Sequence, residues 1–249
     1  MADKKIIEVK DLTVRYGERT ILENVNFHIN RGEIFVIVGG SGCGKSTLLR
    51  QLIGLETPTN GEIYFENVNF TSADKKQKNQ ILRRFGVLFQ SSGLFASMTL
   101  AENIALVLEK YTDLPDDKIE KIIEMKLDAV GLNGFQDFLP SEISGGMKKR
   151  AAFARSMALD PDVLFFDEPS SGLDPVTSAS LDELIVQINR GLGTTMVIVS
   201  HDLASILNVA HRIIMLDKSE KGIIATGTPD ELRNSPDERV YNFFNRIAS

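Results

Sequence analysis

The sequence is poor in the residues that build metal centres and disulfide frameworks. Its 249 residues include one cysteine, three histidines and no tryptophan. The single cysteine, Cys43, cannot form an intramolecular disulfide, which is typical of a reducing compartment. The histidines (His28, His201 and His211) show no metal-ligand spacing. The composition therefore excludes a disulfide-stapled scaffold and gives little support to a zinc site.

Long apolar runs and an excess of positive charge are also absent. The longest apolar stretches, such as 34–38 and 104–108, fall far short of the ~20 residues that a membrane-spanning helix needs. The first residues show no charged segment followed by the apolar core of a secretory signal. The net charge of −6 argues against general nucleic-acid binding. We therefore expect a soluble intracellular globular protein without a nucleic-acid partner.

Apolar segments that alternate with helical patterns make up most of the chain. Four short segments are apolar at consecutive positions, as in strands that are covered on both faces. They are 34–38, 163–166, 196–199 and 213–216. Helical patterns at 45–54, 176–188 and 203–209 lie between or beside them. This alternation predicts an α/β fold with a parallel sheet, preceded by a strand-rich segment at 6–29.

The middle of the chain has a different pattern. Residues 94–159 contain helical patterns at 100–109, 116–130 and 145–158 and no convincing strand. The strands resume afterwards without a Pro/Ser/Gly linker, so two independent domains are the weaker interpretation. We predict a single domain, 1–249, whose core (1–93 and 160–249) carries a helical insertion at 94–159.

A phosphate-binding loop is predicted between the strand at 34–38 and the helix at 45–54. Gly39-x-x-x-x-Gly44-Lys45-Ser46 has the P-loop spacing, in which backbone N–H groups and a helix N-terminus surround phosphate oxygens. Lys45 would reach the β- and γ-phosphates, and the Ser46 hydroxyl would bind Mg²⁺. The predicted nucleotide-binding residues of this loop are Gly39, Gly40, Ser41, Gly42, Cys43, Gly44, Lys45, Ser46 and Thr47. The alternative is a plain glycine-rich turn, and we interpret Cys43 as a small side chain in a crowded loop, not a redox sensor.

Two carboxylates follow the apolar strand at 163–166. Asp167 is placed to hold Mg²⁺, as the acid at the end of a buried strand does in P-loop enzymes. Glu168 points elsewhere and could accept a proton from the water that attacks the γ-phosphate. Either residue alone would be an ordinary strand-end acid, and the P-loop is what gives them a function.

A second anion site is predicted at the start of the helix at 145–158. Ser144, Gly145 and Gly146 combine a hydroxyl with free N–H groups at a positive helix end. The Asn-Lys-x-Asp motif of GTPases is absent. One chain rarely needs two such sites for one nucleotide, so the second site is expected to contact the ATP of another copy.

With these motifs in place, the sequence resembles the ATP-binding-cassette (ABC) ATPases over residues 6–232. Ser144-Gly-Gly resembles the family signature, and Gln90 matches the glutamine that touches Mg²⁺ and the attacking water. Ser171-Gly-Leu-Asp174 resembles the D-loop. His201 resembles the histidine that senses the γ-phosphate, and Tyr16 resembles the aromatic residue that stacks on adenine. Each residue alone has a structural explanation, such as helix capping by Asp174. Their joint order carries the resemblance.

The resemblance implies the fold, the cofactors and the division of roles. It implies a P-loop NTPase (RecA-like) α/β core with an N-terminal antiparallel β subdomain and an inserted α-helical subdomain, acting with ATP and Mg²⁺. By this resemblance the catalytic residues are Glu168, His201 and Gln90. The metal ligands are Ser46, Gln90 and Asp167. The nucleotide contacts include Tyr16, Asp174 and Ser144–Gly146. Met147 replaces the usual signature glutamine and Ile143 the usual leucine, and activity is expected to survive both changes.

Further features resemble a subfamily, the ATPases of Mla/MCE-type phospholipid transporters. They are Ser-Gly-Gly-Met followed by basic residues, the segment 89–95, and the ending at 227–244. The alternatives are the ATPase of an ABC importer for a polar small solute, a soluble ABC ATPase acting on ribosomes or DNA, and a non-catalytic cassette. The last is disfavoured because Lys45, Asp167, Glu168 and His201 are all present.

The resemblance also implies partners and a location. It implies an ATP-dependent homodimer at the cytoplasmic face of the bacterial inner membrane, bound peripherally to integral-membrane permease subunits. An MCE-type substrate-binding protein and a small regulatory subunit are further expected partners. The apolar side chains of Leu94, Phe95 and Met98 are the predicted contact for a short permease helix.

Overall fold

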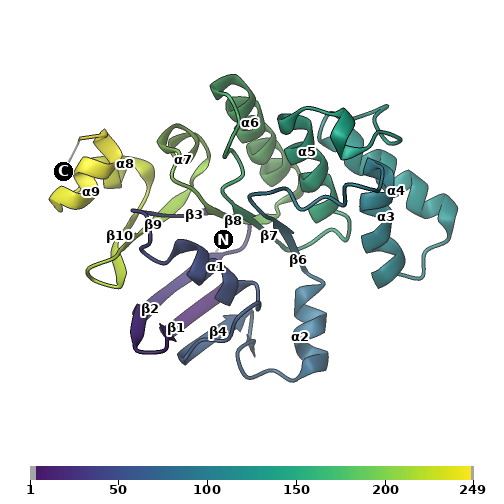
Figure 1. Cartoon of the computed structure of the whole chain (residues 1–249). Coiled ribbons are helices and arrows are strands. Elements are labelled where there is room, and N and C mark those ends of the chain that lie inside the picture. Colours follow the sequence, from purple (N-terminus) through teal and green to yellow (C-terminus); the bar gives the residue numbers. More distant parts are fainter. Residues whose placement is uncertain (1–3, 248–249) are drawn as a thin grey trace.

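The computed structural model describes residues 4–247 and contains two β-sheets with helices packed around them (Figure 1). The larger sheet has the strand order β10-β9-β3-β8-β7-β6. Its strands are β3 (Ile34–Gly39), β6 (Phe85–Leu88), β7 (Val163–Asp167), β8 (Thr195–Val199), β9 (Arg212–Asp217) and β10 (Gly222–Gly227). Strands β3, β6, β7, β8 and β9 are parallel to one another, and β10 pairs antiparallel with β9. The predicted parallel α/β core is confirmed.

The larger sheet is buried on both faces, which explains the continuous apolar runs of its strands. In β3, Ile34, Val36 and Val38 enter one hydrophobic core, whereas Phe35 and Ile37 enter a second core on the opposite face. Side chains alternate across a strand, so each core receives every second residue. The helices α5 (Gly145–Ser156) and α6 (Pro175–Leu192) lie above the sheet in Figure 1, and α1 (Lys45–Leu52) lies below it.

The smaller sheet is antiparallel and packs below the larger one, next to α1 (Figure 1). Its strand order is β2-β1-β4-β5. The strands are β1 (Lys5–Tyr16), β2 (Arg19–Asn30), β4 (Asn60–Phe65) and β5 (Val68–Asn69). This confirms the expected antiparallel β subdomain, and β1 and β2 are the strands that the period-two pattern at 6–29 predicts.

Helices occupy the predicted insertion. They are α3 (Leu100–Tyr111), α4 (Asp116–Ala129) and α5, with a short 3₁₀ turn, η1 (Pro140–Glu142). A capping box starts α3, because the Thr99 hydroxyl accepts from the N–H of Glu102 while the Glu102 carboxylate accepts from the N–H of Thr99. The insertion joins β6 to β7, which are neighbours in the sheet, so it can project to one side without breaking the core.

Several elements were not predicted from the sequence. The missed helices are α2 (Lys75–Leu82), α8 (Pro229–Arg233) and α9 (Glu238–Asn245), and the missed strands are β4, β5 and β10. In α2 only Ile81 is buried, so no apolar stripe marks it. The predicted helix at 203–209 is present as α7 (Leu203–Val209), and α6 extends beyond 188 to Leu192, where Gly193 (φ 66°) ends it.

Candidate nucleotide-binding and catalytic site

The glycine-rich loop between β3 and α1 has the geometry of an anion-binding nest. Gly39 has φ 146°, and a Cβ there would lie 2.3 Å from the Leu216 carbonyl oxygen, so no other residue fits. Gly44 (φ 105°) occupies the N-cap of α1. Among the described residues, no side chain caps α1 and no acid stands in its first turn, so its N-terminal N–H groups remain available for an anion.

Lys45 folds back over this loop. Its ammonium donates to the carbonyl oxygens of Gly39 (2.8 Å) and Gly40 (3.1 Å). The charge is thereby held at the mouth of the nest, where phosphate oxygens of a nucleotide would sit. Cys43 is buried, and burial raises the pKa of its thiol, which fits the packing interpretation and not a reactive thiolate.

The carboxyl ends of the parallel strands bring the predicted catalytic residues together. Asp167 ends β7 and pairs with Val199 at the end of β8, so Glu168 and His201 follow at the same edge of the sheet. His201 Nδ1 lies 2.7 Å from Glu168 Oε2. Glu168 adopts φ 50°, a conformation unusual for a non-glycine residue.

Asp167 lies in an electrostatically unfavourable position. Burial and the neighbouring Glu168 raise its pKa, although Arg50, Lys45 and Lys149 oppose the shift. A partly buried carboxylate whose pKa is raised despite nearby cations is suited to a divalent cation. With the Ser46 hydroxyl and an amide of Gln90 it provides the oxygen donors that Mg²⁺ prefers, so these predicted ligands fit the ion chemically.

Gln90 lies just beyond β6 and is held by two elements. Its side-chain Nε2 donates to Ser171 Oγ at 3.1 Å, which connects it to the predicted D-loop. Its backbone carbonyl accepts a hydrogen bond from the ammonium of Lys149 on α5. Lys149 is only 5% exposed, and burial lowers its pKa, although Asp167 and Glu168 oppose this. Sequence analysis missed Lys149. The available signal was its spacing, because residues three and four positions apart share a helix face, and Ala152 and Phe153 are on the buried face of α5.

The second predicted anion site is at the start of α5. Ser144 is the N-cap, and its hydroxyl accepts from the N–H of Met147 at 3.3 Å. A Cβ on Gly146 would lie 2.5 Å from Thr177 Cγ2, so glycine lets α5 approach α6 closely. The two anion sites belong to different packing units, since α5 packs on α3, α4, α6 and β6 while α1 packs on β3, β7 and β8.

Two predicted nucleotide contacts have additional structural partners. Tyr16 ends β1 with its ring exposed, and its hydroxyl donates to Glu56, which raises the pKa of Tyr16. Asp174 caps α6 by accepting from the N–H groups of Val176 and Thr177, both at 3.1 Å. The capping role expected of Asp174 is confirmed, and its contact with nucleotide stays a prediction.

The segment after Gln90 is fixed by the helical insertion. The buried Asn103 side chain accepts from the Phe95 N–H (2.8 Å) and donates to the carbonyl oxygens of Phe95 and Met98 (both 3.1 Å). Arg155 donates to the carbonyl oxygens of Ser92 and Gly93. Of the three predicted docking side chains, Phe95 is 51% exposed and Met98 is half-buried, whereas Leu94 packs against the core of the insertion.

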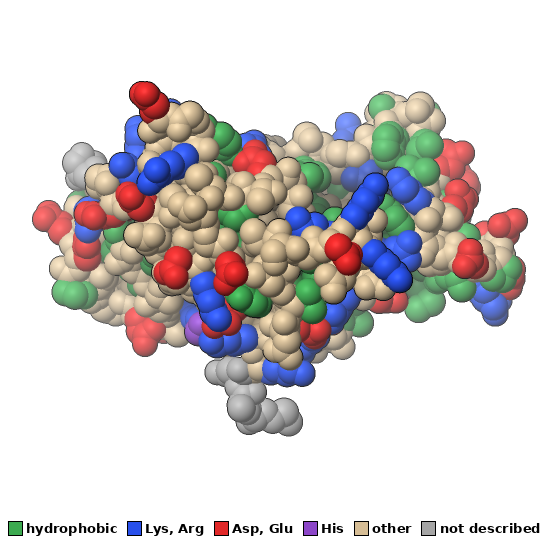
Figure 2. Space-filling model, turned by 90° about the horizontal axis from the view of Figure 1, so that it is seen from below, with side chains coloured by type: hydrophobic (Ala, Val, Ile, Leu, Met, Phe, Trp, Pro, Cys, Tyr) green, Lys and Arg blue, Asp and Glu red, His purple; other side chains and the backbone are tan. Residues whose placement is uncertain are grey.

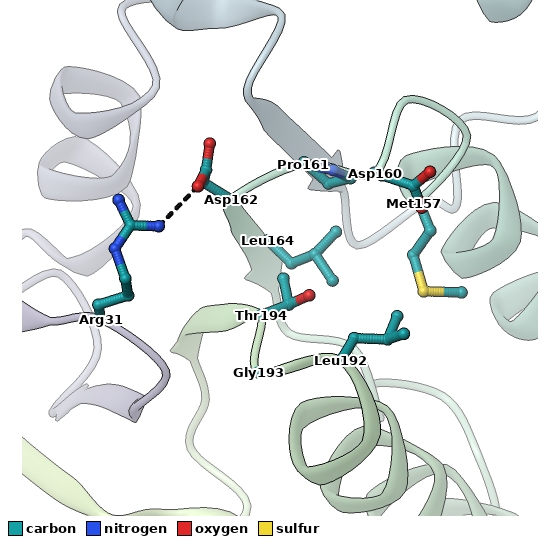
Figure 3. Close-up of a pocket in the computed structure, with 9 residues that line it drawn as sticks. All are labelled: Arg31, Met157, Asp160, Pro161, Asp162, Leu164, Leu192, Gly193 and Thr194. Atoms are coloured by element: carbon teal, nitrogen blue, oxygen red, sulfur yellow. Dashed lines mark hydrogen bonds and ion pairs between the residues drawn. The ribbon is translucent and has the colours of Figure 1, made fainter.

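A separate pocket of about 360 Å³ lies at the opposite edge of the larger sheet (Figure 3). Asp162 immediately precedes β7, five residues before Asp167, and its carboxylate pairs with Arg31 (2.7 Å) and Arg84 (2.6 Å). Arg84 also pairs with Glu66 at 3.0 Å. These four charges connect the two sheets. Because they satisfy one another, we assign this edge a structural role.

Comparison with known proteins agrees with this geometry. The family model "ABC transporter" matches residues 22–171. The chain is 40% identical over 241 residues to the intermembrane phospholipid transport system ATP-binding protein MlaF of Haemophilus influenzae, covering 97% of this chain and 90% of the relative. It is 41% identical to MlaF of Escherichia coli (strain K12), covering 98% and 90%.

More distant relatives and solved structures show the same cassette. The probable ribonucleotide transport ATP-binding protein mkl of Mycobacterium tuberculosis (strain H37Rv) is 40% identical over 96% of this chain, which spans 66% of that relative. The dimeric ATP-binding cassette MJ0796 bound to ADP and Pi has TM-score 0.80 at 30% identity, covering 89% of this chain and 98% of that one. The cassette cbiO1 of Clostridium perfringens has TM-score 0.85 at 29% identity, covering 98% and 95%.

The matches over most of the chain confirm the expected fold and the expected ABC-type ATPase activity. In the described residues 4–247, no helix has the length and apolarity to cross a bilayer. The chain belongs to the ABC transporter family, as an ATP-binding subunit.

Proposed function

We propose that this protein is the ATP-hydrolysing subunit of a transporter that moves phospholipids between bacterial membranes. The observation that carries the lipid assignment is the near-full-length similarity to two MlaF proteins. ATP hydrolysis is supported independently by the arrangement of Lys45, Asp167, Glu168 and His201 around one edge of the sheet.

The proposed chemistry follows from the positions of these side chains. The N–H groups of residues 39–47 and the Lys45 ammonium would bind the phosphates of ATP, and Ser46, Gln90 and Asp167 would hold Mg²⁺, which would supply positive charge to the phosphates. The Glu168 carboxylate accepts the proton of the attacking water. The contact of His201 with Glu168 would orient that carboxylate, and it supports the proposed role of the imidazole in sensing the γ-phosphate.

We propose that two copies share each nucleotide. Residues 39–47 of one copy would face Ser144–Gly146 of the other, because the two anion sites lie in separate packing units of one chain. The dimeric state of the similar cassette MJ0796 supports this arrangement. Loss of the γ-phosphate removes a charge that both copies contact, so hydrolysis would open the dimer.

The proposed partners are integral-membrane permease subunits at the cytoplasmic face of the inner membrane, with an MCE-type substrate-binding protein and a small regulatory subunit. Phe95 and Met98 are the proposed permease anchors, and Leu94 supports them from within the insertion. The exposed Phe95 ring follows the segment that Gln90 begins, so a permease helix seated there could sense the nucleotide site through the Ser92–Phe95 backbone.

A second candidate is an importer of a polar solute. It is favoured by the similarity to the mkl proteins, whose name refers to ribonucleotide transport and which are 40–41% identical over 96% of this chain. The catalytic residues would be the same in both transporters, and the difference would lie in the associated membrane subunits.

Mass spectrometry of the membrane complex that co-purifies with the tagged full chain tests the proposal. We expect a permease and an MCE-type protein, and the complex in vesicles should transfer labelled phospholipid only with hydrolysable ATP. Phe95→Asp should reduce recovery of the permease without changing the ATPase rate of the isolated subunit. A soluble solute-binding protein in place of the MCE-type protein would favour the importer.

A further inference from the structure

The surface of α2 has a charge opposite to that of the chain as a whole. Residues 75–84 contain five cationic residues and no acidic one, whereas the whole chain has net charge −6. Only Ile81 of α2 is buried, and the exposed residues of α2 and its C-cap are Lys75, Lys76, Gln77, Asn79, Gln80, Leu82 and Arg83. Viewed from below, Lys and Arg side chains gather over this part of the molecule (Figure 2).

Internal ion pairs do not account for these cations. Within the described part of the chain, no carboxylate lies within 4.0 Å of the charged groups of Lys75, Lys76 or Arg83. The adjacent Asp74 carboxylate is used as the α2 N-cap, where it accepts from the Gln77 N–H at 2.8 Å. Arg84, by contrast, is fully engaged with Glu66 and Asp162.

Apolar side chains stand between these cations. Leu82 is 37% exposed and Tyr111, at the end of α3, is 41% exposed. The Arg83 guanidinium lies 5.4 Å from the centre of the Tyr111 ring, and the Lys110 ammonium lies 5.5 Å from it. The basic face of α2 therefore continues onto α3. We call Lys75, Lys76, Leu82, Arg83, Lys110 and Tyr111 the α2 surface.

The α2 surface and the proposed permease contact lie towards opposite ends of α3, because Phe95 bonds to Asn103 near its start and Arg83 stacks on Tyr111 at its end. The helix α2 leads directly into β6, and α3 begins after the docking segment that contains Phe95. The Arg83–Tyr111 contact joins the end of α2 to the end of α3. A permease bound at Phe95 would hold the ATPase next to a bilayer, which the cationic side chains of the α2 surface could then contact.

We propose that the α2 surface binds the anionic headgroups of a phospholipid bilayer. Lysine and arginine side chains that approach such a surface strengthen attachment by about 5-fold each. Leu82 and the Tyr111 ring suit the headgroup region, where an apolar body can enter while the polar groups stay hydrated. This contact adds to the proposed function and would set the orientation of the ATPase beneath its permease.

Flotation of the purified full chain with vesicles tests the proposal without any permease. The probes are phosphatidylcholine vesicles with and without about 30% phosphatidylglycerol. We expect binding only to the anionic vesicles, and its loss when salt shortens the screening length to about 3 Å. The triple variant Lys75→Ser, Lys76→Ser, Arg83→Ser should bind about 100-fold more weakly.

A matched control changes the net charge equally at other exposed positions. The control combines Lys118→Ser, Lys121→Ser and Lys218→Ser, at positions on α4 and after β9. This triple variant should bind the vesicles like the parent. Both triple variants should keep the parental ATPase rate and melting temperature, which shows that they fold. No binding of the parent to anionic vesicles, or equal loss in both triple variants, would overturn the proposal and would favour an acidic protein segment or overall charge.

Failure of the vesicle-binding proposal can be distinguished from failure of the proposed transport function. Vesicle binding needs no permease, so it can fail while the complex still co-purifies and transfers lipid. In that complex, the α2 triple variant should still recover the permease, because Phe95 is intact, and should transfer lipid more slowly only when anionic lipid is present.

Discussion

The two ends of β7 carry aspartates with opposite environments. Asp162, before the strand, is partly buried, yet hydrogen bonds from Arg84 and Arg31 outweigh the effect of burial and lower its pKa. Asp167, at the other end, is also partly buried but lies beside Glu168, and its pKa is raised. The negative charge of Asp162 is therefore neutralised within the protein, whereas that of Asp167 is suited to a bound ligand that brings positive charge. The difference separates a structural edge from a catalytic edge within one strand.

The largest expected effect is at the catalytic edge. Glu168→Gln removes the proposed proton acceptor while preserving size, so the ATP turnover number should fall by about 10²–10⁴-fold. ATP binding should persist, and the variant should remain dimeric in Mg-ATP. Steady-state kinetics and sedimentation of the complex measure both effects. A turnover number within a few-fold of the parent would remove Glu168 from the mechanism.

The next effect concerns the P-loop cation. Lys45→Ala deletes a charge-assisted contact with phosphate worth about 1.5–3 kcal/mol, so ATP affinity should fall by about 10- to 100-fold. Calorimetric titration with ATP measures the change. Arg50→Ala offers a control because it removes a cation from the same helix, α1, without touching the Gly39 and Gly40 carbonyl oxygens. Equal affinities of the parent and Lys45→Ala would contradict the assignment.

Lys149 joins the catalytic edge to the helical insertion. Lys149→Met should leave the Gln90 carbonyl without its donor and reduce the turnover number by about 10-fold, as expected for loss of one charged hydrogen bond. The KM for ATP should change little, because Lys149 contacts the Gln90 backbone and not the P-loop. Lys149→Arg should restore most of the rate, and Lys148→Met is the matched control. A KM effect alone would mean that Lys149 serves nucleotide binding.

At the structural edge, Asp162→Asn should destabilise the fold without slowing ATP turnover. The expected loss is about 1–2 kcal/mol, less than for a fully buried pair because Arg31 and Arg84 are more than a third exposed. Each kcal/mol lowers the melting temperature by about 2–4 °C in a chain of this size. Because the folded-state pKa of Asp162 is lowered, its contribution is complete above the unfolded value of 3.8 and fades as the pH falls below it.

The smallest expected effect is that of Asp167→Asn on the melting temperature, and its sign is opposite to that of Asp162→Asn. Without nucleotide, Asp167→Asn should leave the melting temperature at neutral pH unchanged or slightly raise it, since it removes a buried charge beside Glu168. The raised pKa means that ionised Asp167 opposes folding above its unfolded value, and the difference from the parent should vanish at acidic pH. Thermal melts of the Asp162 and Asp167 variants at several pH values make the comparison. Destabilisation by both at neutral pH would remove the distinction between the edges.

The sequence was informative where local spacing imposes a backbone conformation. The P-loop spacing predicts a glycine-rich turn, and Gly39 and Gly44 adopt positive φ there (146° and 105°). Asp174-Pro175 predicts the start of α6 at the residue where it begins. The polar helix α2 and the short strand β5 were missed, because each depends on tertiary packing and not on a local apolar pattern.

By itself, the sequence determined the order of the buried parallel strands and of the helices in the insertion, the P-loop, the acidic end of β7 and the ABC family, because these depend on spacing along the chain. Only the tertiary structure decided that Lys149 is buried against the Gln90 carbonyl and that Asp162 is neutralised while Asp167 is not. It also decided that Leu94 packs inward while Phe95 is exposed. The physical reason is that burial and charge pairing join residues distant in sequence, such as Arg31 and Asp162, whose proximity no local pattern encodes.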